Sequence, residues 1–160
     1  MKRLLILFLL LSCSISILPR ISCNERSILF VLINSYDQIF VENRVITIYE
    51  LKGIIKEFID NPNNANDYSD KFEWEIPYLG KTKISKGVIC VMCDRSTTYQ
   101  KYIDVQNEIE KALNELRNEL AIEKLNMNYK RLNKDKQKAI NWAIPKNITE
   151  PTYVYSIKNN

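Results

Sequence analysis

The segment Cys90-Val91-Met92-Cys93 has the cysteine spacing of a thiol redox motif. Such a motif works because a helix N-terminus lowers the pKa of its first thiol. Here the pair lies within the apolar run of residues 87–93, which predicts a strand. Residues three apart in a strand point to opposite faces, which prevents the two sulfur atoms from pairing. We therefore expect small buried core thiols; a low-pKa thiol at either position would instead indicate an exported thiol oxidoreductase.

The chain contains no histidine among its 160 residues. This removes the usual general base at neutral pH, the commonest metal ligand and every catalytic triad built on imidazole. The acidic residues Glu57, Asp60, Asp67 and Asp70 lack the close, fixed spacing of a metal or glycosidase site. The composition therefore predicts a binding protein that is not an enzyme and that uses neither a metal nor a cofactor.

The polar stretch of residues 94–99 joins the end of a predicted strand to the start of a predicted helix. One interpretation is structural: Asp94 and Thr97 cap the helix, and Arg95 lies in solvent or pairs with Asp94. The other is that Asp94, Arg95, Thr97 and Tyr99 form a rim that contacts a partner protein. The sequence leaves both interpretations open.

The net charge of +4 is mild, and no long basic run is interleaved with aromatic residues, which argues against nucleic acid as a partner. Basic residues are concentrated in the C-terminal third of the chain. They are Lys124, Lys130, Arg131, Lys134, Lys136 and Lys138. Such a cluster is either a solvated face or a contact for a membrane surface or an acidic partner.

Apolar runs predict the strands that position these residues. Residues 27–34 form a continuous run rich in β-branched side chains, so we expect a strand buried on both faces. Residues 39–41 and 44–46 flank Glu42-Asn43, and since Asn tolerates positive φ, this arrangement predicts a two-residue hairpin. Residues 74–80 contain Pro77 and predict an edge element at most.

Helix-capping residues and the periodicity of apolar residues predict three helices. Thr47 and Glu50 have capping-box spacing at the start of a helix that ends at Asn61-Pro62. Residues 97–100 have the same spacing and open the longest helix. The apolar stripe of that helix consists of Ile109, Leu113, Leu116 and Leu120. Asn133 caps a short last helix that runs to Ala143.

These elements predict an α+β domain, a small open β-sheet with helices packed on one face, over residues 24–150. Before it, residues 1–23 form a signal or membrane-anchor segment: Lys2-Arg3 precede an apolar run over residues 4–18. As a helix this run spans roughly 22 Å, short of the ~30 Å hydrocarbon core, so a cleaved signal and a short anchor both fit. Residues 10–13 also resemble a lipoprotein cleavage box, with Cys13 as the lipidated residue. Under each interpretation the domain is exported, and residues 151–160 form a polar tail.

From about residue 24 to about residue 150 the chain resembles the periplasmic domain of the ExbD/TolR biopolymer-transport family, in the long form typical of Bacteroidetes. The matching blocks are FVLINSYDQIFVE (30–42), ELKGIIKEFIDNPNN (50–64), IPYLGKTKISKGVI (76–89), DRSTTYQKYIDVQNEIEKALNELRNELA (94–121) and LNKDKQKAI (132–140). An Asp at the strand end followed by a Tyr entering the helix, here Asp94 and Tyr99, is the part shared most widely across that family.

The resemblance implies an accessory subunit that acts by protein binding in a TonB-dependent system driven by the proton gradient, which powers uptake through outer-membrane receptors. It implies dimerisation, an ExbB-like membrane partner, a TonB-like transducer, and an inner-membrane location with the domain in the periplasm. One departure stands out: family members carry an Asp inside the transmembrane helix, whereas residues 4–18 contain no acidic residue. The alternative is an exported lipoprotein of the same fold that serves as a structural or binding module without a transport role.

Overall fold

The computed structural model describes residues 27–63, 65–66 and 68–150. The predicted segment 1–23, with Cys13 and Cys23, and the tail 151–160 lie outside the described residues. Within the described residues, no helix combines the length and hydrophobicity needed to cross a membrane.

The main sheet is mixed and has five strands in the order β3-β2-β1-β6-β7. The strands are β1 (Ile28–Ile33), β2 (Ile39–Val41), β3 (Arg44–Ile46), β6 (Val88–Cys93) and β7 (Ile148–Thr149). At its centre β1 and β6 run parallel in a six-residue register. The β1-β2-β3 part is antiparallel, whereas β7 pairs parallel to β6 through Ile89 and Cys90.

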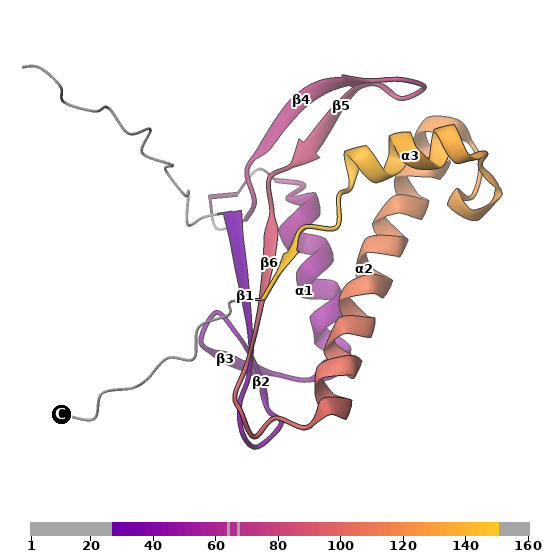
Figure 1. The fold of residues 1–160 in the computed structure, drawn as a ribbon. Coiled ribbons are helices and arrows are strands. Elements are labelled where there is room, and N and C mark those ends of the chain that lie inside the picture. Colours follow the sequence, from indigo (N-terminus) through magenta and orange to yellow (C-terminus); the bar gives the residue numbers. More distant parts are fainter. Residues whose placement is uncertain (1–26, 64, 67, 151–160) are drawn as a thin grey trace, which may run out of the picture.

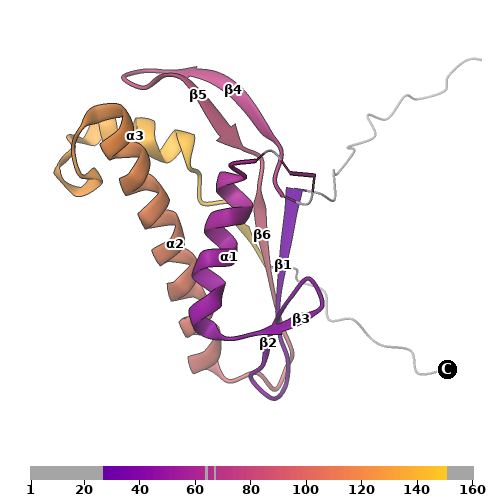
Figure 2. The same cartoon turned by 180° about the vertical axis from the view of Figure 1, so that it is seen from behind.

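Helices α1 (Ile48–Asp60) and α2 (Tyr99–Leu125) lie side by side on one face of this sheet (Figures 1 and 2). The core between them and the sheet is wholly apolar. Its largest members with almost no exposure are Leu29, Val31, Ile33, Ile39, Leu51, Ile55, Phe58, Ile89, Ile109 and Leu113. The protein is therefore an α+β fold with a single layer of helices on the main sheet.

A second, smaller core lies at one end of the molecule. A two-stranded antiparallel sheet of β4 (Lys71–Ile76) and β5 (Gly80–Ser85) packs with α3 (Lys134–Ala143) and the 3₁₀ helix η2 (Tyr129–Arg131) against the end of α2. We call residues 71–86 and 129–146 the lobe (upper part of Figure 1). The third helix thus packs on the β4-β5 hairpin. The prediction of a single open sheet would have placed this helix on the main sheet.

Several local predictions are confirmed because they depend on neighbouring residues. Glu42 and Asn43 have positive φ of 49° and 62°, as the two-residue turn between β2 and β3 requires. The Glu50 carboxylate accepts hydrogen bonds from the Thr47 backbone N–H (2.7 Å) and hydroxyl (2.8 Å) at the start of α1. The Asn133 side chain accepts from the Lys136 N–H and caps α3.

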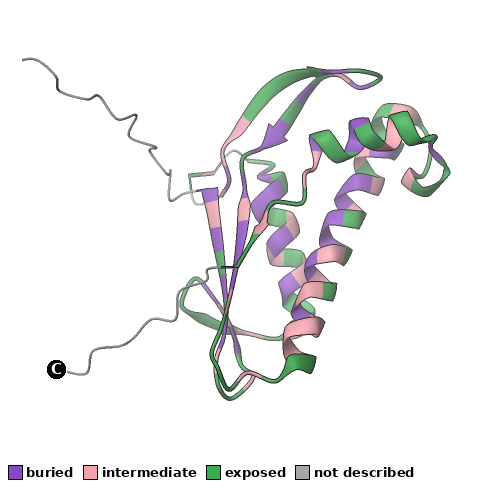
Figure 3. Ribbon diagram, in the orientation of Figure 1, coloured by how far each residue is buried: buried purple, intermediate pink, exposed green. Residues whose placement is uncertain are grey.

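The prediction that the first strand is buried on both faces is wrong. In β1 the burial alternates: Leu29, Val31 and Ile33 face the helices, whereas Phe30 and Leu32 remain 46% and 39% exposed on the outer face. The alternation is visible along the sheet in Figure 3. Phe30 and Leu32 are exposed because no described helix covers the outer face of this sheet. An apolar run in the sequence does not show whether one face of a strand or both faces are covered.

Two further predictions are corrected. Residues 74–80 do not form one extended piece: β4 ends before Pro77, and Pro77 and Tyr78 make the turn into β5, a strand that the sequence did not predict. A proline is tolerated there because a turn residue need not donate to the ladder. The cap of α2 is Thr98, whose side chain accepts from the Lys101 N–H, and not Thr97.

Gly87 and Gly53 provide a matched test of packing. A Cβ at Gly87 would lie 2.9 Å from Phe58 Cε1 and 3.0 Å from Ser85 Oγ, whereas a Cβ at Gly53 would meet nothing within 4 Å. We expect Gly87→Ala to lower the free energy of unfolding by about 1–3 kcal/mol. Gly53→Ala, in α1, should raise it by about 0.5–1 kcal/mol. Urea unfolding followed by circular dichroism measures both, and equal effects of the two substitutions would contradict the packing described around Gly87.

Candidate partner-binding site

A surface hollow of about 350 Å³ lies where β6 passes into α2. Three of the four residues that the sequence nominated, Asp94, Thr97 and Tyr99, line it. Arg95 is exposed on the same loop but is not part of the lining. The other lining residues are Val91, Cys93, Thr98, Tyr102 and Glu150. The nominated loop therefore forms one wall of a site that also draws on β6, α2 and the end of the described chain.

The loop is held in place by its bonds to the end of β1. The Asp94 N–H donates to the Ile33 carbonyl (2.9 Å), and the Thr97 hydroxyl lies 3.1 Å from that same oxygen and 3.2 Å from the Asn34 carbonyl. The Thr97 N–H donates to the Asp94 carbonyl (3.1 Å). Thr97 thus positions the rim. The Asp94 carboxylate accepts a long hydrogen bond from the Ser96 N–H in the same loop (3.4 Å), and both Asp94 and Tyr99 are exposed and so accessible to a partner.

Asp37 fixes the start of α2 from the opposite side. Its carboxylate accepts from the Thr98 N–H (3.0 Å) and the Thr98 hydroxyl (2.8 Å). These two bonds, the backbone one first, favour the charged form and lower the pKa of Asp37 below its usual value. Sequence reasoning missed Asp37, although it lies in the polar turn after β1 and has a positive φ of 58°.

Glu150 closes the other wall of the hollow. Its carboxylate accepts from the Tyr102 hydroxyl (2.5 Å) and from the Gln106 amide (3.1 Å). The hydrogen bond to Glu150, more than burial, raises the pKa of Tyr102. No sequence signal indicated this contact, because β7 brings Glu150 to α2 across 48 residues.

Tyr99 is the most accessible large side chain of the hollow. It is 78% exposed, and its ring centroid lies 6.3 Å from that of Tyr102. An exposed aromatic ring beside a charged group is a frequent anchor in protein interfaces, because it buries a large area at a small cost in side-chain entropy. Tyr99 and Asp94 therefore have the chemistry of a contact surface.

The hollow adjoins an open sheet edge. The Ile89 N–H bonds to Asn147 on the β7 side, so by strand alternation Val91 and Cys93 direct their backbone groups to that same edge. In the described part of the chain, no strand continues beside β6 past Thr149. An extended peptide could bond to this edge while its side chains enter the hollow.

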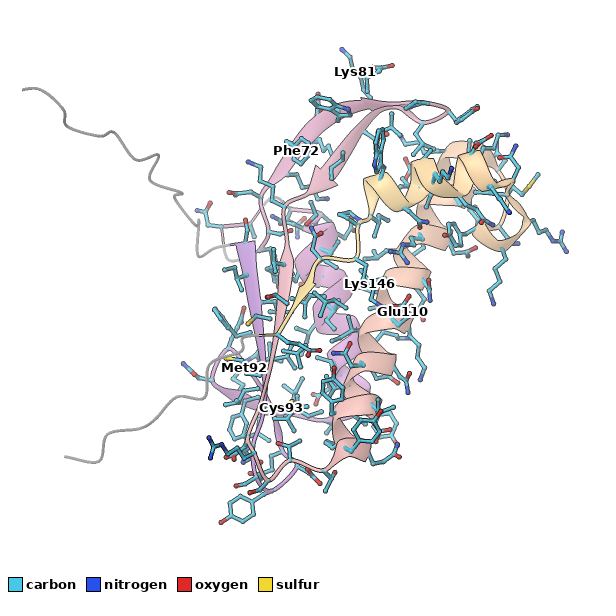
Figure 4. All side chains as sticks on the ribbon, viewed as in Figure 1. Phe72, Lys81, Met92, Cys93, Glu110 and Lys146 are labelled. Atoms are coloured by element: carbon cyan, nitrogen blue, oxygen red, sulfur yellow. The ribbon has the colours of Figure 1, made fainter. Side chains whose placement is uncertain are left out.

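Cys90 and Cys93, the two cysteines among the described residues, are free thiols on opposite sides of β6. Cys90 is buried, as expected, but Cys93 is exposed at the hollow, so the prediction of two core thiols is wrong for Cys93 (Figure 4). Burial raises the pKa of both thiols, and the negative charge of Glu150 raises that of Cys93 further. Both thiols are thus disfavoured as thiolates at neutral pH, the opposite of what a redox motif needs.

Among the described residues, no group of three His, Cys, Asp or Glu side chains is placed to hold a metal ion. Compared with known proteins, the chain matches no family model and no curated protein. The site is therefore defined by its own geometry: an exposed Tyr and Asp, a hollow and a strand edge. This arrangement fits the binding of a peptide or protein surface.

The depressed pKa of Asp37 predicts a pH dependence of stability. Because its pKa is lower in the folded than in the unfolded chain, its contribution is complete at neutral pH and is lost as the pH falls through the folded value. The stability difference between the native chain and Asp37→Asn should therefore be largest at pH 7 and shrink below about pH 4. Urea unfolding at pH 7, 4 and 3 measures it, and a difference that stays constant would show that the Thr98 bonds do not favour the charged form.

Proposed function

We propose that this chain is an ExbD-like accessory subunit of a TonB-dependent, proton-motive-force-driven system for outer-membrane uptake, and that it acts by protein–protein binding. The observation that carries the proposal is the exposed pair Asp94 and Tyr99 at a hollow beside an open sheet edge. These two residues are also the part of the resemblance that is shared most widely among members of the ExbD/TolR family. In this proposal residues 1–23 keep the domain at the inner membrane, facing the periplasm.

The proposed partner at the rim is an extended segment of a TonB-like transducer. The segment adds to the edge of β6 at residues 91–93, where backbone hydrogen bonds supply affinity without sequence preference. Tyr99 and Asp94 then supply selectivity through an aromatic contact and a fixed negative charge. An ExbB-like protein contacts the membrane segment, and a second copy of the chain completes the subunit.

Tyr99→Ala tests the rim directly. Truncation of a central aromatic anchor costs about 2 kcal/mol or more of binding free energy, so the Kd for the TonB-like transducer should rise about 30-fold. Asp94→Ala should weaken binding in the same direction. Tyr49→Ala is the matched control, since Tyr49 is 88% exposed on α1, outside the hollow. Binding is measured by titration after circular dichroism has established that each variant is folded. Unchanged binding by both rim variants would remove this assignment.

One observation favours a second candidate function. Residues 4–18 contain no acidic residue that could carry the proton in the membrane. An exported lipoprotein of the same fold, serving as a structural or binding module, needs no such residue.

Mass spectrometry of the mature N-terminus separates the two candidate functions. A diacylated Cys13 at the N-terminus is the result expected for the lipoprotein, and an intact Met1 is the result expected for the anchored subunit. A chain that starts at Met1 would exclude lipidation at Cys13, because the modified cysteine must become the first residue.

A further inference from the structure

The lobe carries the positive charge of the protein. Residues 71–86 and 129–146 together hold ten Lys and Arg side chains and three Asp and Glu side chains, a net charge of +7 against +4 for the whole chain. The remaining residues therefore carry a net charge of −3. The basic cluster of the C-terminal third joins β4 and β5 in this lobe because α3 packs on β5 through Ile84, Ala139 and Ile140.

The lobe also carries four exposed aromatic side chains. Trp142 on α3 and Tyr78 at the turn between β4 and β5 are 65% and 60% exposed and line a hollow of about 530 Å³. Trp74 and Phe72, on one face of β4, are 59% and 40% exposed. Both tryptophans of the chain are thus largely in solvent, and Trp and Tyr side chains are enriched at protein interfaces and at membrane surfaces.

The lobe lies at the end of the molecule where the described chain begins. The Asp70 N–H, one residue before β4, donates to the Ser27 hydroxyl (3.4 Å). Eight residues lie between Leu18, the end of the apolar run, and Ser27, so these two residues are at most about 30 Å apart. A chain anchored through residues 4–18 therefore keeps β4 close to the bilayer, whereas the rim lies at the other end of α2.

We propose that the lobe docks on the anionic headgroup surface of the membrane that holds residues 1–23. Trp and Tyr side chains prefer the boundary between headgroups and hydrocarbon, because one part of the ring system is apolar and the other is polar. The lysines of the lobe bind acidic headgroups. This inference rests on the membrane location in the proposed function. It gives the protein a second membrane contact besides residues 1–23, and that contact orients the rim away from the bilayer.

A nucleic acid would match the same charge, but an exported domain does not meet one under any interpretation of residues 1–23. An acidic protein is the remaining competitor for this surface. The bilayer is favoured because the lobe adjoins the first described residue and because its aromatic side chains suit a surface that is apolar below its charges.

The two tryptophans report the contact in the full-length chain. The chain is reconstituted into phosphatidylcholine vesicles, with or without phosphatidylglycerol, that contain either ordinary lipids or lipids brominated near the headgroup. Bromine quenches tryptophan emission on contact, and all tryptophan emission comes from Trp74 and Trp142. We expect a loss of emission with brominated lipids in the anionic vesicles, reversed by high salt. Trp74→Phe and Trp142→Phe assign the loss to each side chain.

A charge variant tests the lysines. Each lysine near an anionic surface strengthens association about fivefold, so Lys134→Gln with Lys138→Gln should reduce the quenching. The matched control is Lys101→Gln with Lys111→Gln, which removes the same charge from the first part of α2, outside the lobe. The control should quench like the native chain.

Two results would overturn the proposal: emission that is the same with brominated and ordinary lipids, or quenching that is equal in neutral and anionic vesicles. Emission that responds to an acidic protein and not to lipid would assign the lobe to that competitor. The transducer-binding titration with Tyr99→Ala tests the rim, which lies at the opposite end of α2 from the lobe. Failure of the lobe proposal and failure of the rim proposal are therefore separate outcomes.

Discussion

The parallel pairing of β1 with β6 is the constraint on which the rest of the structure depends. Val31 and Val91 face each other at its centre, and both are almost completely buried against α1 and α2. Parallel strands need a long crossover between them, and here the crossover contains α1 and the β4-β5 hairpin. Because both strands end at the same edge, the Asp94 N–H reaches the Ile33 carbonyl and the Thr97 hydroxyl reaches that of Asn34. The rim is thus a consequence of the topology.

The length of α2 places the two proposed contact surfaces at opposite ends of the molecule. Its 27 residues span about 40 Å, whereas a six-residue strand covers about 20 Å. The last turns of α2, after Leu116, therefore extend past the main sheet: Ala121 is buried in the second core, whereas Leu113 and Leu116 are still buried in the main core. The hairpin and α3 cover that overhang. One rigid helix consequently links the rim, where we propose protein binding, to the lobe, where we propose membrane contact.

Charged side chains of α2 fix the segment that leads to β7. The buried Arg117 donates from Nε to the Ile144 carbonyl (3.2 Å), and its guanidinium lies 3.8 Å from Glu110. The other Glu110 oxygen pairs with Lys146, in the segment between α3 and β7, at 2.6 Å (both residues are labelled in Figure 4). Anchoring residues 144–146 sets the position of β7 and therefore of Glu150 in the hollow. A half-buried ion pair thus positions one wall of the rim site.

The sequence by itself determined the elements whose cause is local: the Glu42-Asn43 turn, the Thr47 and Asn133 caps, the apolar stripe of α2 and the α+β class. It also placed Asp94, Thr97 and Tyr99 together, since they are neighbours in one loop. Only the tertiary structure decided that Phe30 stays exposed and that Asp37 and Glu150 complete the site. The Asp37–Thr98 and Tyr102–Glu150 contacts span 61 and 48 residues. Such pairings form only when the sheet brings distant segments together, and no local propensity encodes them.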